Sequence, residues 1–254
     1  GRTVKSIWLC GPRRVGKSTV AERLRRVAER DFGCRTCTLD ASEFSTLDQL
    51  LERALDTLGV RDHAGSVRER MSSVAALPTP TLLVVDEADA LAVKLRQPEQ
   101  NYLRVRVEGG SLRLLFVSHR DPFDLVEEVP DVASRLLGIT TVQRIGMFER
   151  EDVETLFETI EREAGLLAFA SLADFAWAQV GGHAVSVMRL AQALAAFGAK
   201  DDATAVDACD RVRSELLVQM ESLWREISPG TRAAIRSGRA IIDDNYCRTE
   251  ATAD

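Results

Sequence analysis

One stretch of the chain, residues 9–19, combines residue types and a spacing that suit phosphate binding. From Gly11 to Ser18 it reads G-x-x-x-x-G-K-S. The two glycines, Gly11 and Gly16, permit a tight turn in which successive backbone N–H groups point at phosphate oxygens. Lys17 supplies a positive charge for the β- and γ-phosphates, and the Ser18 hydroxyl can coordinate Mg²⁺. The stretch predicts a site for a nucleoside triphosphate and Mg²⁺.

The flanks of this loop agree with that interpretation. Residues 6–10 form an apolar run typical of a strand, and residues 17–30 carry a helical pattern. The positive end of that helix then faces the anion. A glycine-rich connection without a ligand is the alternative, and it is disfavoured because strand, loop and helix occur together. The residues expected to contact the nucleotide are Gly11, Pro12, Arg13, Arg14, Val15, Gly16, Lys17, Ser18 and Thr19.

Two acidic residues close a second apolar run, residues 81–86. Asp86 and Glu87 follow at the carboxyl end of this predicted strand, which is the edge where ligands of open α/β sheets bind. A carboxylate there favours a cation, so Asp86 is the predicted partner of Ser18 in holding Mg²⁺. Glu87 is the predicted catalytic residue that orients or deprotonates the attacking water. The alternative is that residues 86–89 are only the acidic start of a helix.

Four further residues are candidates for the same site. Ser118 and Arg120 end the next apolar run and are expected to sense the γ-phosphate, unless they form an ordinary strand-end turn. Arg135 follows a proline-containing loop and is expected to reach a neighbouring subunit's nucleotide, with a solvated surface arginine as the alternative. His183 begins a later helix, where it either contacts the nucleotide or serves as a helix cap.

These residues require a sheet that brings them to one edge. Strands and helices alternate in the first part of the chain, with a turn before the last strand, and only helices follow from Glu151 onward. This order predicts a doubly wound parallel sheet followed by a helical domain, with the boundary near residues 147–151. The further predicted strands are residues 34–39, 112–118 and 141–145; the helices are 45–59, 67–77, 151–164, 169–180, 184–197 and 202–226.

Composition and charge limit the class of protein. The chain has 254 residues, 45% of them hydrophobic, which favours a folded protein over a disordered one. Its net charge of −6 is uneven: residues 1–120 hold 20 Lys and Arg against 15 Asp and Glu, and the remainder holds 13 against 24. A basic half is expected around a polyphosphate site, so the charge does not by itself indicate nucleic acid.

Location is predicted from what the sequence lacks. It has no long uncharged apolar run and no signal-peptide pattern, and its abrupt start suggests a fragment whose natural beginning lies upstream. An odd number of cysteines argues against a disulfide framework and for free thiols in a reducing compartment. We therefore expect a cytoplasmic protein without membrane contact. The five cysteines are Cys10, Cys34, Cys37, Cys209 and Cys247.

The motifs together resemble the archaeal-ATPase and STAND (signal-transduction) branch of the AAA+ superfamily. Residues 11–19 resemble its G-P-R-R-x-G-K-[ST] loop, and residues 82–87 its Walker B strand. Residues 118–120 are similar to its sensor 1, and residues 181–183 to the G-G-H-P motif of its helical lid. Residues 228–240 are similar to the opening of the winged helix that follows in these proteins.

The resemblance implies a fold and an activity. The fold is a five-stranded parallel P-loop sheet over residues 1–148, an all-helical lid over 149–226 and the start of a winged helix over 227–254. The activity is slow, Mg²⁺-dependent ATP binding and hydrolysis that acts as a switch in a larger signalling or defence protein. Bound nucleotide would be ATP or ADP, and the ATP state would form a homo-oligomer or engage other protein domains.

Two alternatives remain open at this point. Residues 86–91 also resemble origin-recognition initiators and transposition-regulator ATPases, which implies a DNA-bound AAA+ ATPase. A scaffold that holds nucleotide without hydrolysing it is the other alternative, and the presence of Glu87 argues against it.

Overall fold

A computed structural model of the chain forms two compact units. One comprises the residues up to Pro12 together with Gly16–Ile145, and the other comprises Arg13–Val15 together with the residues from Gly146 onward. The structure describes residues 6–60, 65–92, 97–110, 112–128, 136–226, 240–243 and 246–249.

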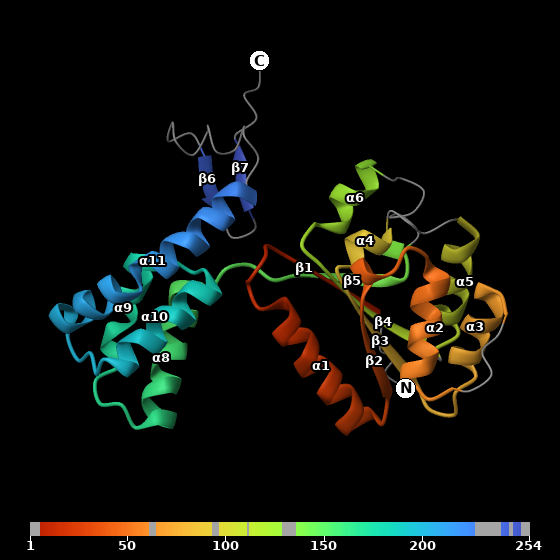
Figure 1. Ribbon diagram of the computed structural model, residues 1–254, viewed down its shortest axis with the longest axis horizontal. Helices are drawn as coiled ribbons and strands as arrows, with labels where there is room; N and C mark the ends of the chain where they lie inside the picture. Colours follow the sequence, from red (N-terminus) through yellow and green to blue (C-terminus); the bar gives the residue numbers. More distant parts are fainter. Residues whose placement is uncertain are drawn as a thin grey trace, which may run out of the picture. The chain divides into compact units, whose positions relative to one another are not determined.

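The first unit is built on a five-stranded sheet (Figure 1). Its strands lie in the order β2-β3-β4-β1-β5, and every pairing is parallel. This confirms the predicted five-stranded parallel sheet, and it places the loop that follows β1 at the same edge of the sheet as the carboxyl ends of β3 and β4. The strands are β1 (Ser6–Cys10), β2 (Arg35–Asp40), β3 (Thr81–Asp86), β4 (Leu112–Ser118) and β5 (Thr140–Arg144).

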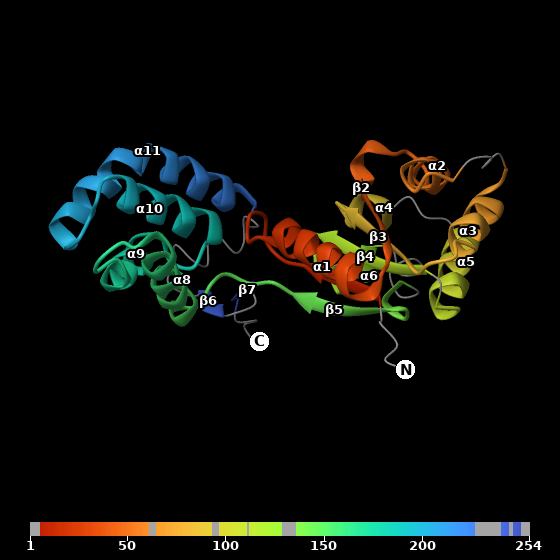
Figure 2. The ribbon, with the colours of Figure 1, turned by 90° about the horizontal axis from the view of Figure 1, so that it is seen from below.

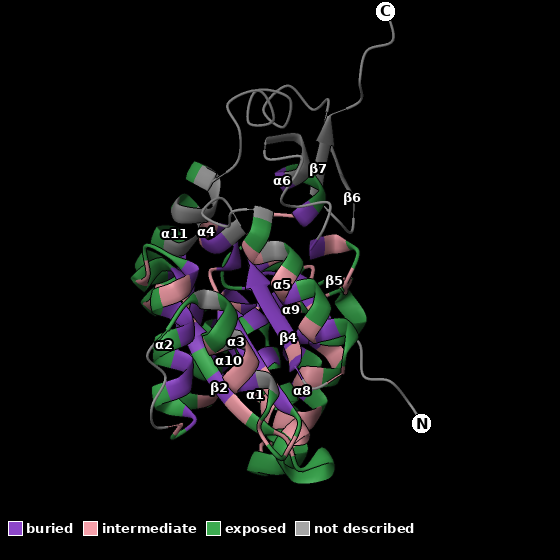
Figure 3. Ribbon diagram, turned by 90° about the vertical axis from the view of Figure 1, so that its right-hand side faces the viewer, coloured by how far each residue is buried: buried purple, intermediate pink, exposed green. Residues whose placement is uncertain are grey.

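Helices cover both faces of this sheet, because successive side chains of a buried strand point to opposite sides. On one face, Val84 and Leu115 pack with Ala21 of α1 (Lys17–Phe32). On the other face, Leu83 and Phe116 belong to a larger core shared with the remaining helices of the unit. Figure 1 shows α1 and α2 on opposite sides of the sheet, and Figure 3 shows β4 buried along most of its length. The helical elements on the larger core are η1 (Ala41–Glu43), α2 (Leu47–Thr57), α3 (Val67–Ala75), α4 (Ala88–Ala92), α5 (Gln97–Glu108) and α6 (Pro122–Glu128).

The segment after β4 differs from the sequence prediction, which expected a turn. Helix α6 begins there instead, because Asp121 accepts a hydrogen bond from the backbone N–H of Phe123 at 2.9 Å. Pro122 follows at the first helical position, where its missing N–H has no helical partner to lose. Asp-Pro at this point is therefore a helix start.

The second unit is helical from Arg150 to Glu226, as the sequence predicted (Figure 2). Its core includes Phe157 and Phe169, whose rings stack with centroids 4.9 Å apart. The helix predicted over 169–180 is a 3₁₀ turn followed by a separate helix. Within the described residues, no helix is long and apolar enough to cross a membrane. The elements are α8 (Arg150–Ala164), η2 (Ala170–Leu172), α9 (Ala173–Val180), α10 (Ala184–Ala196) and α11 (Asp202–Glu226).

The last described segment of the chain is a short hairpin. An antiparallel hairpin pairs β6 (Ala240–Asp243) with β7 (Tyr246–Thr249). The predicted opening of a winged helix, residues 228–240, lies outside the described residues except for Ala240, which begins β6. The predicted free thiols are present at Cys10, Cys34, Cys37 and Cys209.

Candidate nucleotide-binding site

The phosphate-binding loop begins at Gly11, where the backbone leaves β1 for α1. Ile145, the residue after β5, donates its N–H to the Cys10 carbonyl oxygen at 2.8 Å. A Cβ atom on Gly11 would lie 2.1 Å from the Ile145 carbonyl oxygen, so only glycine fits. Gly16 has a φ of 98° and caps the start of α1, a conformation that glycine adopts without strain. Both glycines of the motif are therefore required by the backbone.

We expect Gly11→Ala to lower the free energy of unfolding by about 2 to 3 kcal/mol, because the new methyl group must displace a backbone carbonyl. Chemical denaturation measures this loss. Gly33→Ala is the matched control: Gly33 also has a positive φ, 61°, but open space around it, so the expected loss is about 1 kcal/mol. Equal losses in the two variants would mean that the close approach at Gly11 is not rigid.

Lys17 is the first residue of α1 and is only 9% exposed. Its Nζ donates to the carbonyl oxygens of Gly11, at 3.0 Å, and Pro12, at 2.7 Å. A buried ammonium needs such acceptors. The side chain therefore lies against the loop that the sequence predicts to surround the phosphates.

The predicted magnesium residues meet in the structure. The Ser18 hydroxyl, from α1, donates to Asp86 Oδ2 at 3.2 Å, although the residues are far apart in the sequence. Asp86 is the last residue of β3, and its Oδ1 accepts the backbone N–H of Glu87 at 2.9 Å. A hydroxyl and a carboxylate at this separation are the oxygen donors that Mg²⁺ favours in phosphate sites. The residues present fit that ion.

Glu87 has an unusual backbone conformation for its residue type. Its φ is 50°, in the left-handed region that non-glycine residues rarely adopt. Strain of this kind persists where surrounding structure enforces it, and it is frequent at functional sites. The Glu87 side chain is 44% exposed, so its carboxylate can meet a water molecule.

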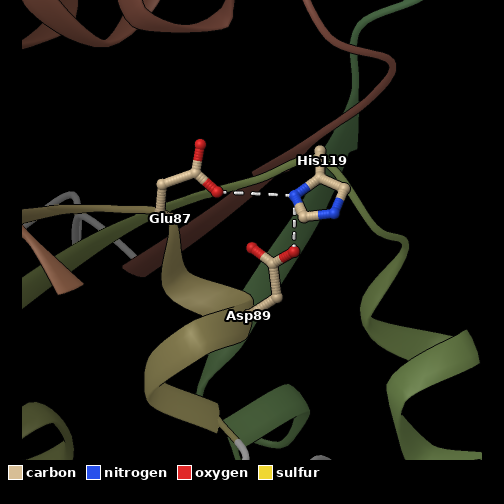
Figure 4. A group of neighbouring side chains, drawn as sticks. All are labelled: Glu87, Asp89 and His119. Atoms are coloured by element: carbon tan, nitrogen blue, oxygen red, sulfur yellow. Dashed lines mark ion pairs between the residues drawn. The ribbon is translucent and has the colours of Figure 1, made fainter. Parts of the chain in front are cut away.

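Two residues beside Glu87 were not among the predicted site residues. His119 Nδ1 lies 2.6 Å from Asp89 Oδ2 and 3.5 Å from Glu87 Oε2 (Figure 4). His119 directly follows β4, and Asp89 lies in α4, just after β3. The available signal was their position after two strands of the sheet, because such ends meet at one edge of a parallel sheet.

Ser118 is the last residue of β4, and it is only 1% exposed. Alternation along β4 puts Ser118 on the same side as Phe116, in the layer that holds Trp8. The hydroxyl accepts from Trp8 Nε1 at 2.8 Å and donates to the Arg120 carbonyl oxygen at 2.7 Å. The Ser118 hydroxyl therefore has two partners within the protein, and contact of Ser118 or of the half-buried Arg120 with the γ-phosphate stays a prediction. Arg135 lies outside the described residues.

His183 lies in the second unit, at the N-cap position of α10. It is 1% exposed, and its Nδ1 is 2.8 Å from the Ser186 hydroxyl oxygen. The preceding residue, Gly182, accepts the Phe148 N–H at 2.8 Å, and a Cβ on Gly182 would lie 1.9 Å from the Phe148 carbonyl oxygen. These contacts give the glycine–histidine motif a packing role within the second unit. A nucleotide contact by His183 stays a prediction.

Cys10, the residue before the loop, carries no charge at neutral pH. Burial raises the pKa of the Cys10 thiol to about 11, and the nearby carboxylate of Asp121 adds to the shift. Asp121 in turn accepts from Arg144 Nε at 2.5 Å, and this hydrogen bond raises the pKa of the Arg144 guanidinium. The Cys10 thiol is therefore protonated and inert beside the loop.

Comparisons with known proteins agree with this geometry. Residues 2–125 match the family described as AAA domain. A comparison with curated proteins finds no match. Among solved structures, the chain is similar to the Walker-type ATPase paby2304 of Pyrococcus abyssi, at 15% identity over 96% of this chain and 88% of that one, with a TM-score of 0.62.

Two origin-recognition proteins of Aeropyrum pernix are also similar in structure. The ORC2 protein, solved as ADPNP-ADP complexes, is 15% identical over 83% of this chain and 62% of its own, with a TM-score of 0.60. The ORC1 protein, solved in complex with DNA, is 17% identical over 95% of this chain and 69% of its own, with a TM-score of 0.55. At these identities the likeness shows the fold alone, and the chain spans only part of both proteins.

Proposed function

We propose that the chain, whose residues 2–125 match the family described as AAA domain, is an ATPase of the archaeal-ATPase-like branch of AAA+ proteins that binds ATP with Mg²⁺ and hydrolyses it. The contact between Ser18 and Asp86 carries this proposal. Two separate elements, α1 and β3, bring a hydroxyl and a carboxylate to 3.2 Å beside the loop that holds Lys17. A loop with a structural role alone would not require a hydroxyl and a carboxylate at this separation.

Each residue then has a defined part in binding. Phosphate oxygens would replace the carbonyl oxygens of Gly11 and Pro12 as acceptors for Lys17 Nζ, which needs only a rotation of the side chain. Ser18 and Asp86 would hold Mg²⁺, which would supply positive charge to neutralise the phosphates. Backbone N–H groups of the loop and the N-terminus of α1 would face the remaining phosphate oxygens.

Hydrolysis requires a base near the γ-phosphate. Glu87 is adjacent to Asp86, is partly exposed and is held in a fixed, left-handed backbone conformation. Its carboxylate is therefore suited to accept a proton from the attacking water. Arg120, after the neighbouring strand β4, is the described residue that we propose for contact with the γ-phosphate.

The biological use of this chemistry is a further part of the proposal. Hydrolysis would reset a conformational or oligomeric switch in a larger signalling or defence protein, because ATP and ADP differ at the γ-phosphate that the sheet edge contacts. In an oligomer, Arg135 of one subunit would complete the site of the next. Such a contact is head-to-tail and builds rings or filaments.

A DNA-bound ATPase of the initiator type is the second candidate. The similarity to an origin-recognition protein solved with DNA favours it. Binding to duplex DNA that weakens steeply as salt rises would support this candidate. No binding at low salt would leave the switch as the better proposal.

Magnesium dependence tests the proposed site. We expect Asp86→Asn to bind ATP with about the same affinity in Mg²⁺ and in EDTA, while the parent chain binds more tightly in Mg²⁺, since the variant loses the carboxylate that attracts the ion. Calorimetric titration measures both affinities. Glu43→Gln, at an exposed carboxylate of η1, is the control that keeps the parent's preference. A parent chain with no preference for Mg²⁺ would contradict the assignment of Ser18 and Asp86.

A further inference from the structure

Three side chains from separate segments converge at the carboxyl edge of the sheet. Glu87 follows β3, Asp89 lies in α4 and His119 follows β4. Their ligand atoms all lie within 4.8 Å of one another. Figure 4 shows the two carboxylates facing the same nitrogen of the imidazole ring. The arrangement offers two oxygen donors and one nitrogen donor to a single point.

Asp89 shows that this cluster differs from an ordinary acidic surface. Its side chain is only 7% exposed and both of its carboxylate oxygens are buried; Oδ2 pairs with His119 Nδ1, whereas Oδ1 accepts no hydrogen bond from the described residues. His119 Nδ1 is also buried, and it lies 2.6 Å from Asp89 Oδ2 and 3.5 Å from Glu87 Oε2. A buried carboxylate is normally hydrogen-bonded or coordinates a cation. A cation shared by Asp89 and His119 would supply a partner for the buried carboxylate.

We propose that Glu87, Asp89 and His119 form a binding site for a divalent transition-metal ion such as Zn²⁺, separate from the Ser18–Asp86 pair. Imidazole nitrogen with carboxylate oxygen suits Zn²⁺, whereas Mg²⁺ prefers oxygen ligands alone. Donors at about 2.0 to 2.2 Å from one ion lie about 3 to 3.5 Å from each other. The distance of 3.5 Å between Glu87 Oε2 and His119 Nδ1 already has this value. The distance of 2.6 Å between Asp89 Oδ2 and His119 Nδ1 would have to increase when the ion binds.

Metal bound at this site would affect ATP hydrolysis, and this consequence rests on the proposed function of Glu87 as the base. A Glu87 carboxylate bound to Zn²⁺ cannot accept the proton of the attacking water. The ion would therefore lower turnover while leaving ATP binding intact, because Lys17 and Ser18 lie outside the cluster. The site would make the ATPase sensitive to transition metals.

The test begins with metal binding to the nucleotide-free chain, after removal of any affinity tag. Zn²⁺ is titrated by calorimetry in excess Mg²⁺, and Co²⁺ is titrated by its visible absorption, which reports the ligand type. We expect His119→Gln and Asp89→Asn each to weaken Zn²⁺ binding by at least about tenfold. Ser18→Ala and the exposed-carboxylate variant Glu43→Gln are controls that keep the parent affinity. His119 is partly exposed, so His119→Gln remains informative if Asp89→Asn fails to fold.

Two results would overturn the inference. One is a Zn²⁺ affinity that is equal in the parent and the His119→Gln variant. The other is a cobalt spectrum with the charge-transfer band of thiolate ligands, which would place the ion on cysteines. Metal binding is measured without nucleotide, so its result does not depend on ATP hydrolysis. If the chain binds Co²⁺ through His119 but does not hydrolyse ATP, the metal site stands and only the proposed function is wrong.

Discussion

Lys17→Ala is expected to abolish measurable ATP binding at micromolar protein, with a loss of about 2 to 5 kcal/mol in binding free energy. The reason is local: Lys17 Nζ lies against the loop carbonyls of Gly11 and Pro12, buried where the phosphates would lie. Phosphate charges placed there without a mobile cation would be desolvated and uncompensated. Calorimetric titration with Mg²⁺ and ATP measures the loss.

A matched control separates this effect from a general loss of basic charge. Arg23 is an exposed cation on the same helix, α1, and Arg23→Ala should leave ATP affinity within about twofold. A thermal melt of each variant checks that the loop still folds without the Lys17 hydrogen bonds. Unchanged ATP affinity in a folded Lys17→Ala protein would remove the P-loop assignment.

Glu87→Gln is expected to bind ATP as the parent does and to turn it over about 10² times more slowly, or slower still. Glutamine keeps the size and hydrogen-bonding reach of the side chain but cannot accept the proton of the attacking water. The substitution changes a partly exposed side chain, so the fold should tolerate it. Single-turnover phosphate release with saturating ATP isolates the chemical step.

The exposed variant Glu43→Gln should hydrolyse ATP at the parent rate. Equal turnover in Glu87→Gln and the parent would mean that another group accepts the proton of the attacking water. Asp89, the other carboxylate of the cluster, would then be the next residue to test. A loss of ATP binding in Glu87→Gln would instead mean that Glu87 contributes to binding.

Local patterns were sufficient for much of the fold. The glycines, Lys17 and Ser18 could be predicted because a short loop between a strand and a helix fixes their positions relative to each other. The strand at residues 81–86 was evident from its continuous apolar character. Its carboxyl end placed Asp86 and Glu87 at the same edge of the sheet as the loop after β1. The parallel order of the sheet follows from alternating strands and helices.

The rest depended on contacts that a single sequence does not contain. The Ser118 hydroxyl accepts a hydrogen bond from Trp8, a residue far from it in the chain, on the neighbouring strand. The convergence of Asp89 and His119 depends on β3 and β4 being neighbours in the sheet order. Neither spacing nor periodicity reports such a pairing, so the cluster became visible only in the structure.

The measurement that tests the central claim most directly is phosphate release from ATP by the purified chain, with Mg²⁺ and with EDTA. We expect release that requires Mg²⁺, rises with chain concentration and falls to the background in both Lys17→Ala and Glu87→Gln. A parent chain that binds ATP but releases no phosphate above the protein-free blank, at any chain concentration, would contradict the claim and identify a nucleotide-bound scaffold.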